Sequence, residues 1–138
     1  PLPVWHGEDL ICHGFAFSVP SKTTTSTTSK PSSPPVVNVL YLSDISRMIP
    51  ETLEFILETL PPTAMLIVDA LLWHTPNPVH FSLEQAVALR DQIAPTQTTY
   101  LVGMNCDSFL PHEEMNAYLQ TKYGNVQLAH DGLAIHLE

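Results

Sequence analysis

Charged side chains are scarce in this sequence, and positive ones are the scarcest. Only 14% of the 138 residues are charged, and five Lys and Arg against fourteen Asp and Glu give a net charge of −9. Binding to a nucleic-acid backbone requires clustered cations, whereas these five are scattered along the chain. The composition therefore disfavours nucleic acid as a partner and favours a small-molecule substrate.

Cysteine and long apolar runs are also scarce. Cys12 and Cys106 are too few for a disulfide framework, which favours the cytoplasm or another reducing intracellular compartment. The longest apolar run, Ala64 to Val68, is far shorter than the roughly 20 residues that a membrane-spanning helix needs. No signal peptide precedes the first strand, and the chain begins at Pro1 without Met. We therefore expect no membrane partner and expect the chain to be a segment of a longer protein.

Several short catalytic motifs are missing as well. The sequence contains no His-Glu-x-x-His pair, no Cys-x-x-Cys pair, no glycine-rich phosphate loop and no Gly-x-Ser-x-Gly elbow. These absences argue against common zinc proteases, zinc ribbons, P-loop nucleotidases and serine hydrolases. Any active site must therefore be assembled from residues that are distant in the sequence.

One segment differs in composition from the rest. Pro20 to Pro35 consists almost entirely of Ser, Thr, Pro and Lys, so it has no apolar face to bury. We interpret it as a low-complexity insertion within a single domain that spans residues 1–138. A phosphorylated regulatory loop is the alternative interpretation of the same segment.

Outside that segment, strand-like and helix-like patterns alternate. Apolar, β-branched stretches predict strands, and capped amphipathic stretches predict helices. The last two strands should form a hairpin about Asp131-Gly132. The predicted strands are Leu2–His6, Gly14–Val19, Val36–Leu42, Ala64–Ala70, Thr98–Val102, Val126–Ala129 and Leu133–Leu137, and the predicted helices are Pro50–Leu60, Ser82–Ile93 and Pro111–Tyr123. This order predicts an α/β fold with helices packed on a sheet.

Potential metal ligands and acid–base groups follow several of these strands. In α/β sheets, sites gather at strand ends and in the loops that follow them. Each residue alone has a plain structural interpretation, such as a turn, a cap or a solvated side chain. The residues concerned are His6, Asp44, Asp69, His74, His80, Cys106, Asp107 and His112.

Four stretches in order resemble a known family. They are Tyr41–Arg47 (YLSDISR), Leu66–Leu71 (LIVDAL), His80–Ala86 (HFSLEQA) and Asp131–Leu133 (DGL). Together they resemble the metallo-β-lactamase superfamily, and within it the branch that holds the phosphodiesterase of bacterial phosphonate breakdown and its eukaryotic relatives. The resemblance implies the C-terminal half of an αββα sandwich.

The resemblance also implies a partial site for two divalent metal ions, Zn²⁺ or Mn²⁺. His6 and Asp44 match metal ligands, with Asp44 bridging the ions, and His80 matches the residue that protonates the leaving group. The family's His-x-His-x-Asp-His motif, which supplies most ligands, is absent from these 138 residues. Gly103 stands where a last His is expected, so Cys106, as a thiolate, or His112 would have to replace it.

Three functions are therefore open at this point. The resemblance implies a metal-dependent hydrolase of phosphodiesters or related esters, active only together with the missing N-terminal half. A non-catalytic protein of the same fold, degenerate at its metal site, is the main alternative. An unrelated α/β binding module is the third, and the ordered match of four segments argues against it.

Overall fold

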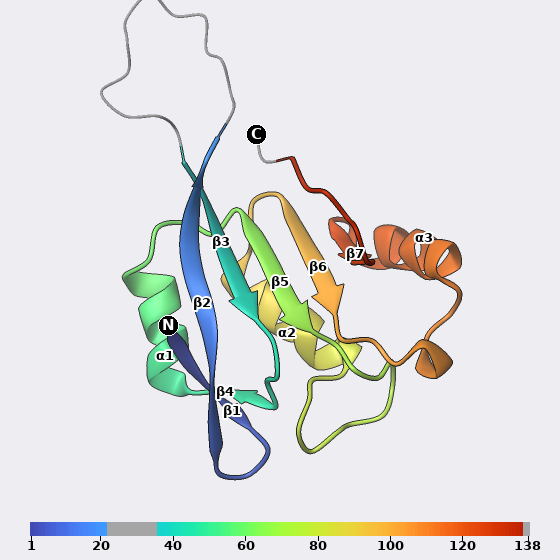
Figure 1. Cartoon of the computed structure of the whole chain (residues 1–138), viewed down its shortest axis with the longest axis horizontal. Helices are drawn as coiled ribbons and strands as arrows, with labels where there is room; N and C mark the ends of the chain where they lie inside the picture. Colours follow the sequence, from blue (N-terminus) through green and yellow to red (C-terminus); the bar gives the residue numbers. More distant parts are fainter. Residues whose placement is uncertain (22–35, 137–138) are drawn as a thin grey trace, which may run out of the picture.

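The computed structural model describes residues 1–21 and 36–136, which form one curled sheet with three helices (Figure 1). The seven strands lie in the order β4-β1-β2-β3-β5-β6-β7. The strands are β1 (Leu2–His6), β2 (Leu10–Pro20), β3 (Val36–Leu42), β4 (Arg47–Met48), β5 (Met65–Asp69), β6 (Thr98–Val102) and β7 (Val126–Leu128), and the helices are α1 (Pro50–Glu58), α2 (Leu83–Ile93) and α3 (His112–Tyr123). The predicted α/β fold is confirmed.

The sheet has an antiparallel part and a parallel part. β4, β1, β2 and β3 pair antiparallel in turn, whereas β3, β5, β6 and β7 pair parallel. Each parallel pair is joined by a connection that contains one α-helix, because parallel strands need a long crossover. The carboxyl ends of β3, β5 and β6 therefore meet at one edge of the sheet.

Local sequence explains where α2 begins and ends. The Ser82 hydroxyl accepts a hydrogen bond from the Gln85 N–H, and the Gln85 side chain accepts one from the Ser82 N–H. This capping box satisfies two backbone donors that a helix start leaves free. Ala94 closes the helix in a left-handed conformation, with φ 51°. The start of this helix fixes the position of the loop just before it.

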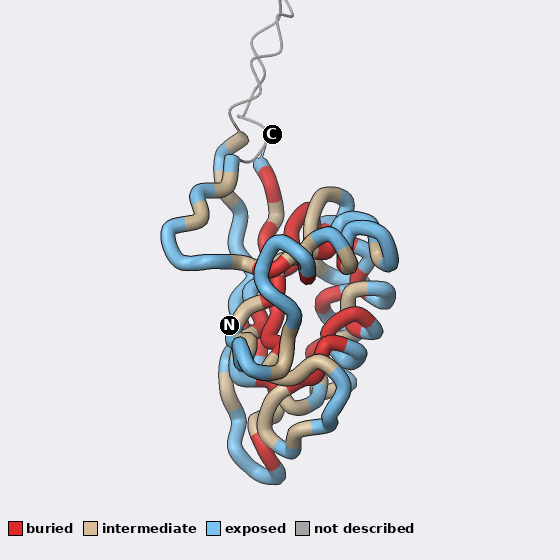
Figure 2. Tube along the Cα trace, turned by 90° about the vertical axis from the view of Figure 1, so that its right-hand side faces the viewer, coloured by how far each residue is buried: buried red, intermediate tan, exposed pale blue. Residues whose placement is uncertain are grey.

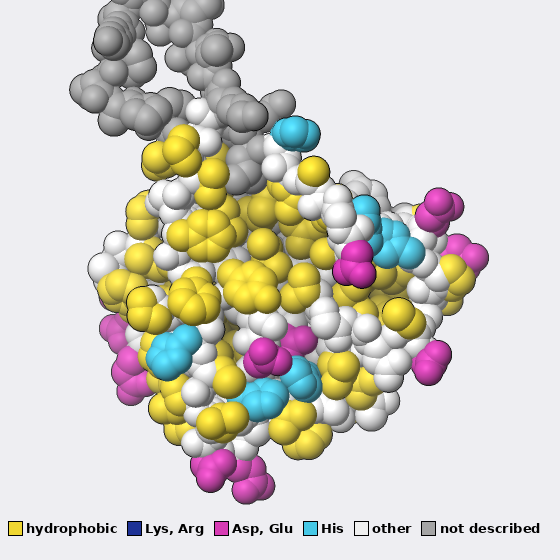
Figure 3. Space-filling view, in the orientation of Figure 1, with side chains coloured by type: hydrophobic (Ala, Val, Ile, Leu, Met, Phe, Trp, Pro, Cys, Tyr) yellow, Lys and Arg dark blue, Asp and Glu magenta, His cyan; other side chains and the backbone are white. Residues whose placement is uncertain are grey.

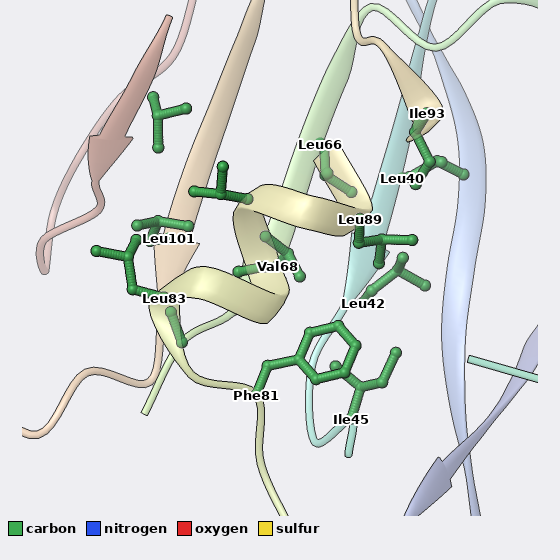
Figure 4. Packing of buried hydrophobic residues seen from close by; sticks show 14 of the residues in the cluster. Leu40, Leu42, Ile45, Leu66, Val68, Phe81, Leu83, Leu89, Ile93 and Leu101 are labelled. Carbon is green, nitrogen blue, oxygen red and sulfur yellow. The ribbon is translucent and has the colours of Figure 1, made fainter. Parts of the chain in front are cut away.

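The hydrophobic core lies between the parallel strands and α2 (Figure 4). Alternate residues of each strand point toward the helix, and all of these are almost fully buried. In the side view of Figure 2 the buried segments run along the strands and the helix turns that face them. The central contacts join Leu40, Leu42, Leu66, Val68 and Leu101 of the sheet to Leu83, Leu89 and Ile93 of α2, with Ile45 and Phe81 at the edge.

The opposite face of the sheet is apolar but open. Cross-strand pairing places Phe15, Tyr41, Ile67 and Tyr100 in one row on this face. Phe15 is 49% exposed, and Phe17, two residues along β2, is 47% exposed. In Figure 3 apolar side chains cover the middle of this face, and in Figure 1 α1 and α2 lie behind the sheet. Among the described residues, the sheet therefore exposes an apolar surface on this side.

The predicted C-terminal hairpin is wrong. β7 ends at Leu128, and residues 129–136 form no strand. The Leu133 N–H does bond to the His130 carbonyl, so a turn forms, but the chain does not pair back onto β7. Leu133 and Ile135 are only half-buried, so a returning strand would bury little apolar surface.

Other boundaries differ by a few residues. β2 begins at Leu10 and ends at Pro20, so Pro20 belongs to a strand and not to the low-complexity insertion. The two-residue strand β4 was not predicted, because two residues show no periodicity. α1 ends at Glu58, two residues early. Residues 22–35 of the predicted insertion lie outside the described residues. No described helix is long and apolar enough to cross a bilayer.

We expect the 138-residue chain by itself to self-associate through the open face. Large contiguous apolar surfaces are rare on monomeric proteins and promote association. Phe15→Ser and Phe17→Ser together should lower the apparent mass measured by light scattering. Leu57→Ser on α1, a residue that is equally exposed at 49%, is the matched control and should change little. A monomeric parent chain would contradict this expectation.

Candidate metal centre

Three predicted site residues come together at one edge of the sheet. His6 ends β1, Asp44 follows β3, and His80 precedes α2. One potential ligand atom from each lies within 4.8 Å of the others, and the rings of His6 and His80 are 5.0 Å apart between centroids. Figure 3 shows histidine and acidic side chains gathered below the apolar face. Sites in α/β sheets commonly occupy this edge, outside the carboxyl ends of the strands.

The turn after β3 is tied directly to the end of β1. The Ser46 N–H bonds to the Trp5 carbonyl at 2.7 Å, and the Ser46 hydroxyl lies 3.0 Å from that oxygen and 3.2 Å from the Gly7 carbonyl. These bonds hold Trp5 and Gly7, the two neighbours of His6, against Ser46. Ser46 itself lies two positions after Asp44. The two predicted ligands are therefore brought together by backbone contacts.

Asp44 has an unusual backbone conformation. Its φ is 53°, in the left-handed region, where Asp and Asn are tolerated better than most other residues with a Cβ. Its side chain is 62% exposed. This conformation turns the chain sharply after β3, and residues in sparsely populated conformations are frequent at functional sites.

The loop before α2 positions His80. The Asn77 side-chain oxygen accepts hydrogen bonds from the backbone N–H groups of Val79 and His80, at 2.9 and 3.1 Å. The His80 Nδ1 atom lies 2.6 Å from a carboxylate oxygen of Asp69, the last residue of β5. His80 is thus fixed at its backbone and at one ring nitrogen. Asp69, one of the candidate residues named from the sequence, is thus the residue that orients His80.

Burial shifts the pKa of the Asp69 carboxyl. The residue is 2% exposed, and its desolvation raises the pKa of the carboxyl above its usual range, although the hydrogen bond and charge of His80 act in the opposite direction. An ionised carboxylate only accepts hydrogen bonds, so pairing with it places the proton of His80 on Nδ1. The Nε2 atom is then the nitrogen left for a metal ion or a substrate.

His6 carries a nitrogen without a partner. Its Nδ1 atom is buried and has no hydrogen bond, a state that typically costs about 1–3 kcal/mol. A divalent cation beside it would compensate for this cost. Two imidazoles and a carboxylate are also the donor types that Zn²⁺ and Mn²⁺ accept. The residues present therefore fit a metal ion.

The other predicted residues lie outside this group. Cys106 is exposed in a short 3₁₀ helix after β6, and its role as a ligand stays a prediction. The ring of His112, at the start of α3, is 5.5 Å from that of His130, and His74 stacks on Trp73. Asn77 and Ser46 were missed from the sequence. The Asn77-Pro78 dipeptide is a turn signal that could have revealed the first.

We expect Asp44→Asn to weaken metal binding without unfolding the protein. Asn tolerates the same left-handed backbone but lacks the charge, so the affinity of the complete protein for Mn²⁺ or Zn²⁺ should fall by at least about 100-fold. Loss of an outer-shell partner alone typically costs roughly 10–100-fold. Calorimetric titration measures this, with Asp131→Asn, an exposed turn residue, as the control. Equal affinities for the two variants would remove Asp44 from the site.

Comparisons with known proteins agree with the geometry. No protein-family model and no curated protein matches this chain. A solved structure described as a new diphosphatase from the PhnP family matches with a TM-score of 0.66 and 30% sequence identity, over 96% of this chain. This chain spans 40% of that diphosphatase chain. The resemblance predicted from the sequence is therefore confirmed: this chain matches part of a PhnP-family diphosphatase, a protein with the metallo-β-lactamase fold.

Proposed function

We propose that the complete protein is a metal-dependent hydrolase of phosphodiesters or related phosphate esters, and that this chain supplies one side of its metal centre. The observation that supports it best is the convergence of His6, Asp44 and His80 at one sheet edge. The similarity to part of a diphosphatase supports the same class of reaction. Because the chain spans only 40% of that protein, the activity is proposed for the complete protein.

His6 and Asp44 are the residues that we propose to hold the metal. The unpartnered Nδ1 atom of His6 and the exposed carboxylate of Asp44 both have free coordination capacity. A carboxylate has two oxygens, so Asp44 could supply a ligand to each ion of a pair of Zn²⁺ or Mn²⁺. Bound divalent ions would supply an activated water and stabilise developing charge on a phosphoryl oxygen.

We propose His80 as the general acid. Its Nδ1 atom is engaged by Asp69 and lies 4.0 Å from a carboxylate oxygen of Asp44, so Nε2 is the ring nitrogen that this pairing leaves unengaged. A protonated Nε2 can pass its proton to the alkoxide that leaves the phosphorus. Such transfer contributes most when the leaving group is strongly basic, because a weakly basic one departs without help.

The lysine and arginine side chains of the described residues are engaged elsewhere, which supports a metal as the source of positive charge for an anionic substrate. The Arg47 guanidinium donates to the carbonyls of Gly7 and Glu8, at 3.1 and 2.8 Å. The other two are Arg90, which pairs with Asp91 and the Tyr123 carbonyl, and Lys122, which lies against Tyr118. The hydrogen bonds and ion pairs of these three side chains are made with other residues than His6, Asp44 and His80. In a chain with a net charge of −9, an anionic substrate would need cations from elsewhere.

A non-catalytic protein of the same fold is the second candidate. It is favoured by one observation: the described group consists of His6, Asp44 and His80, and Cys106, in the 3₁₀ helix after β6, is not part of it. The metal content of the complete protein distinguishes the two functions. Tightly bound ions in a fixed ratio support the hydrolase, and their absence supports the non-catalytic protein.

We expect His80→Gln to slow hydrolysis selectively. In the complete protein with Mn²⁺ or Zn²⁺, turnover of a dialkyl phosphodiester should fall by roughly 10²–10⁴-fold, the usual contribution of a general acid. Turnover of bis(p-nitrophenyl) phosphate should fall much less, because p-nitrophenolate is a weakly basic leaving group. His13→Gln, an exposed histidine on β2, is the matched control and should leave both rates unchanged.

Two results would contradict this proposal. Equal losses for both substrates would make His80 a metal ligand and not an acid. No metal-dependent turnover of either substrate by the wild-type protein would exclude the phosphodiesterase function itself.

A further inference from the structure

Gly103 lies directly against the Asp69 carboxylate. It follows β6 with φ 72°, and a Cβ atom placed on it would lie 2.6 Å from Oδ1 of Asp69. A distance this short is a severe overlap between a carbon and an oxygen. Any residue other than glycine at this position would therefore have to displace the carboxylate or the backbone.

The Asp69 carboxylate has little freedom to move. It is buried, and its other oxygen is 2.6 Å from the His80 Nδ1 atom. Its backbone is fixed too, because Asp69 pairs with Val102 in the sheet. A displacement large enough to relieve the overlap would therefore break a hydrogen bond of the carboxylate.

We propose that Gly103 is a positioning residue for His80. Its missing side chain leaves the space in which the Asp69 carboxylate holds the imidazole by its Nδ1 atom, with the proton on Nδ1 and with Nε2 unengaged by this pairing. The use of that Nε2 atom as an acid rests on the proposed function. The tautomer and orientation of His80 do not depend on it.

A purely conformational need for glycine is the competing explanation, since φ 72° is itself unfavourable for other residues. The chain offers a matched control. Gly124, after α3, has the same φ of 72°, and a Cβ atom there would meet nothing within 4 Å. Gly124→Ala therefore introduces the backbone strain alone, whereas Gly103→Ala introduces both the strain and the overlap with Asp69.

The imidazole tautomer is the first measurement. In the complete protein labelled with ¹⁵N at histidine, the ring nitrogen signals of His80 report which nitrogen carries the proton. We expect the Nδ1-protonated form in the wild type and in Gly124→Ala, and its loss in Gly103→Ala. Turnover of a dialkyl phosphodiester should fall by roughly 10–100-fold in Gly103→Ala alone, the usual effect of losing an outer-shell contact.

If Gly103→Ala folds poorly, a double-mutant cycle of unfolding free energies tests the proposal. In an Asp69→Ser background the overlap is removed, so the destabilisation by Gly103→Ala should shrink to that of Gly124→Ala. An unchanged His80 tautomer in Gly103→Ala, or equal destabilisation with and without Asp69, would overturn the proposal. The two proposals can fail separately. If the wild-type protein has no hydrolytic activity but Gly103→Ala still changes the His80 tautomer, the proposed function is refuted and the role of Gly103 is retained.

Discussion

The hydrogen bond between the buried Asp69 carboxylate and the partly exposed His80 is the contact on which the arrangement of the site depends. Asp69 is placed at the end of β5 by strand pairing, and burial of its carboxylate disfavours the charged form unless a partner compensates. His80 supplies that partner, and the loop that carries it is fixed in turn by Asn77. The pairing with Asp69 thus determines which ring nitrogen of His80 is engaged by the protein.

The sheet brings the remaining groups to this point. Its curl places the antiparallel strands β1 and β4 beside the turn after β3, and the hydrogen bonds of Ser46 join the two. His6 and Asp44 therefore converge although 38 positions separate them in the sequence. The same sheet leaves an apolar face uncovered by the described helices. Rigid strands thus hold the site, while the apolar face of the sheet remains a surface on which another protein segment could pack.

Sequence patterns identified most of the fold because local physics dominates there. The β-branched run Val36–Leu42 and the strand Thr98–Val102 have the bounds predicted for them, and the Ser82 capping box fixed the start of α2. The C-terminal hairpin failed because a turn signal does not ensure a partner strand with apolar surface to bury. Contacts between distant segments, such as Ser46 with Trp5, have no local signal at all.

The candidate site could be predicted only in part for the same reason. His6, Asp44 and His80 came from a resemblance in ordered motifs, since no spacing among them is distinctive. The space that Gly103 leaves for Asp69 is a packing relation between neighbouring strands and is invisible in the sequence. Anomalous diffraction from crystals of the complete protein soaked in Mn²⁺ or Zn²⁺ tests the central claim most directly. The account predicts an anomalous peak within bonding distance of His6 and Asp44, and a well-ordered site without such a peak would contradict it.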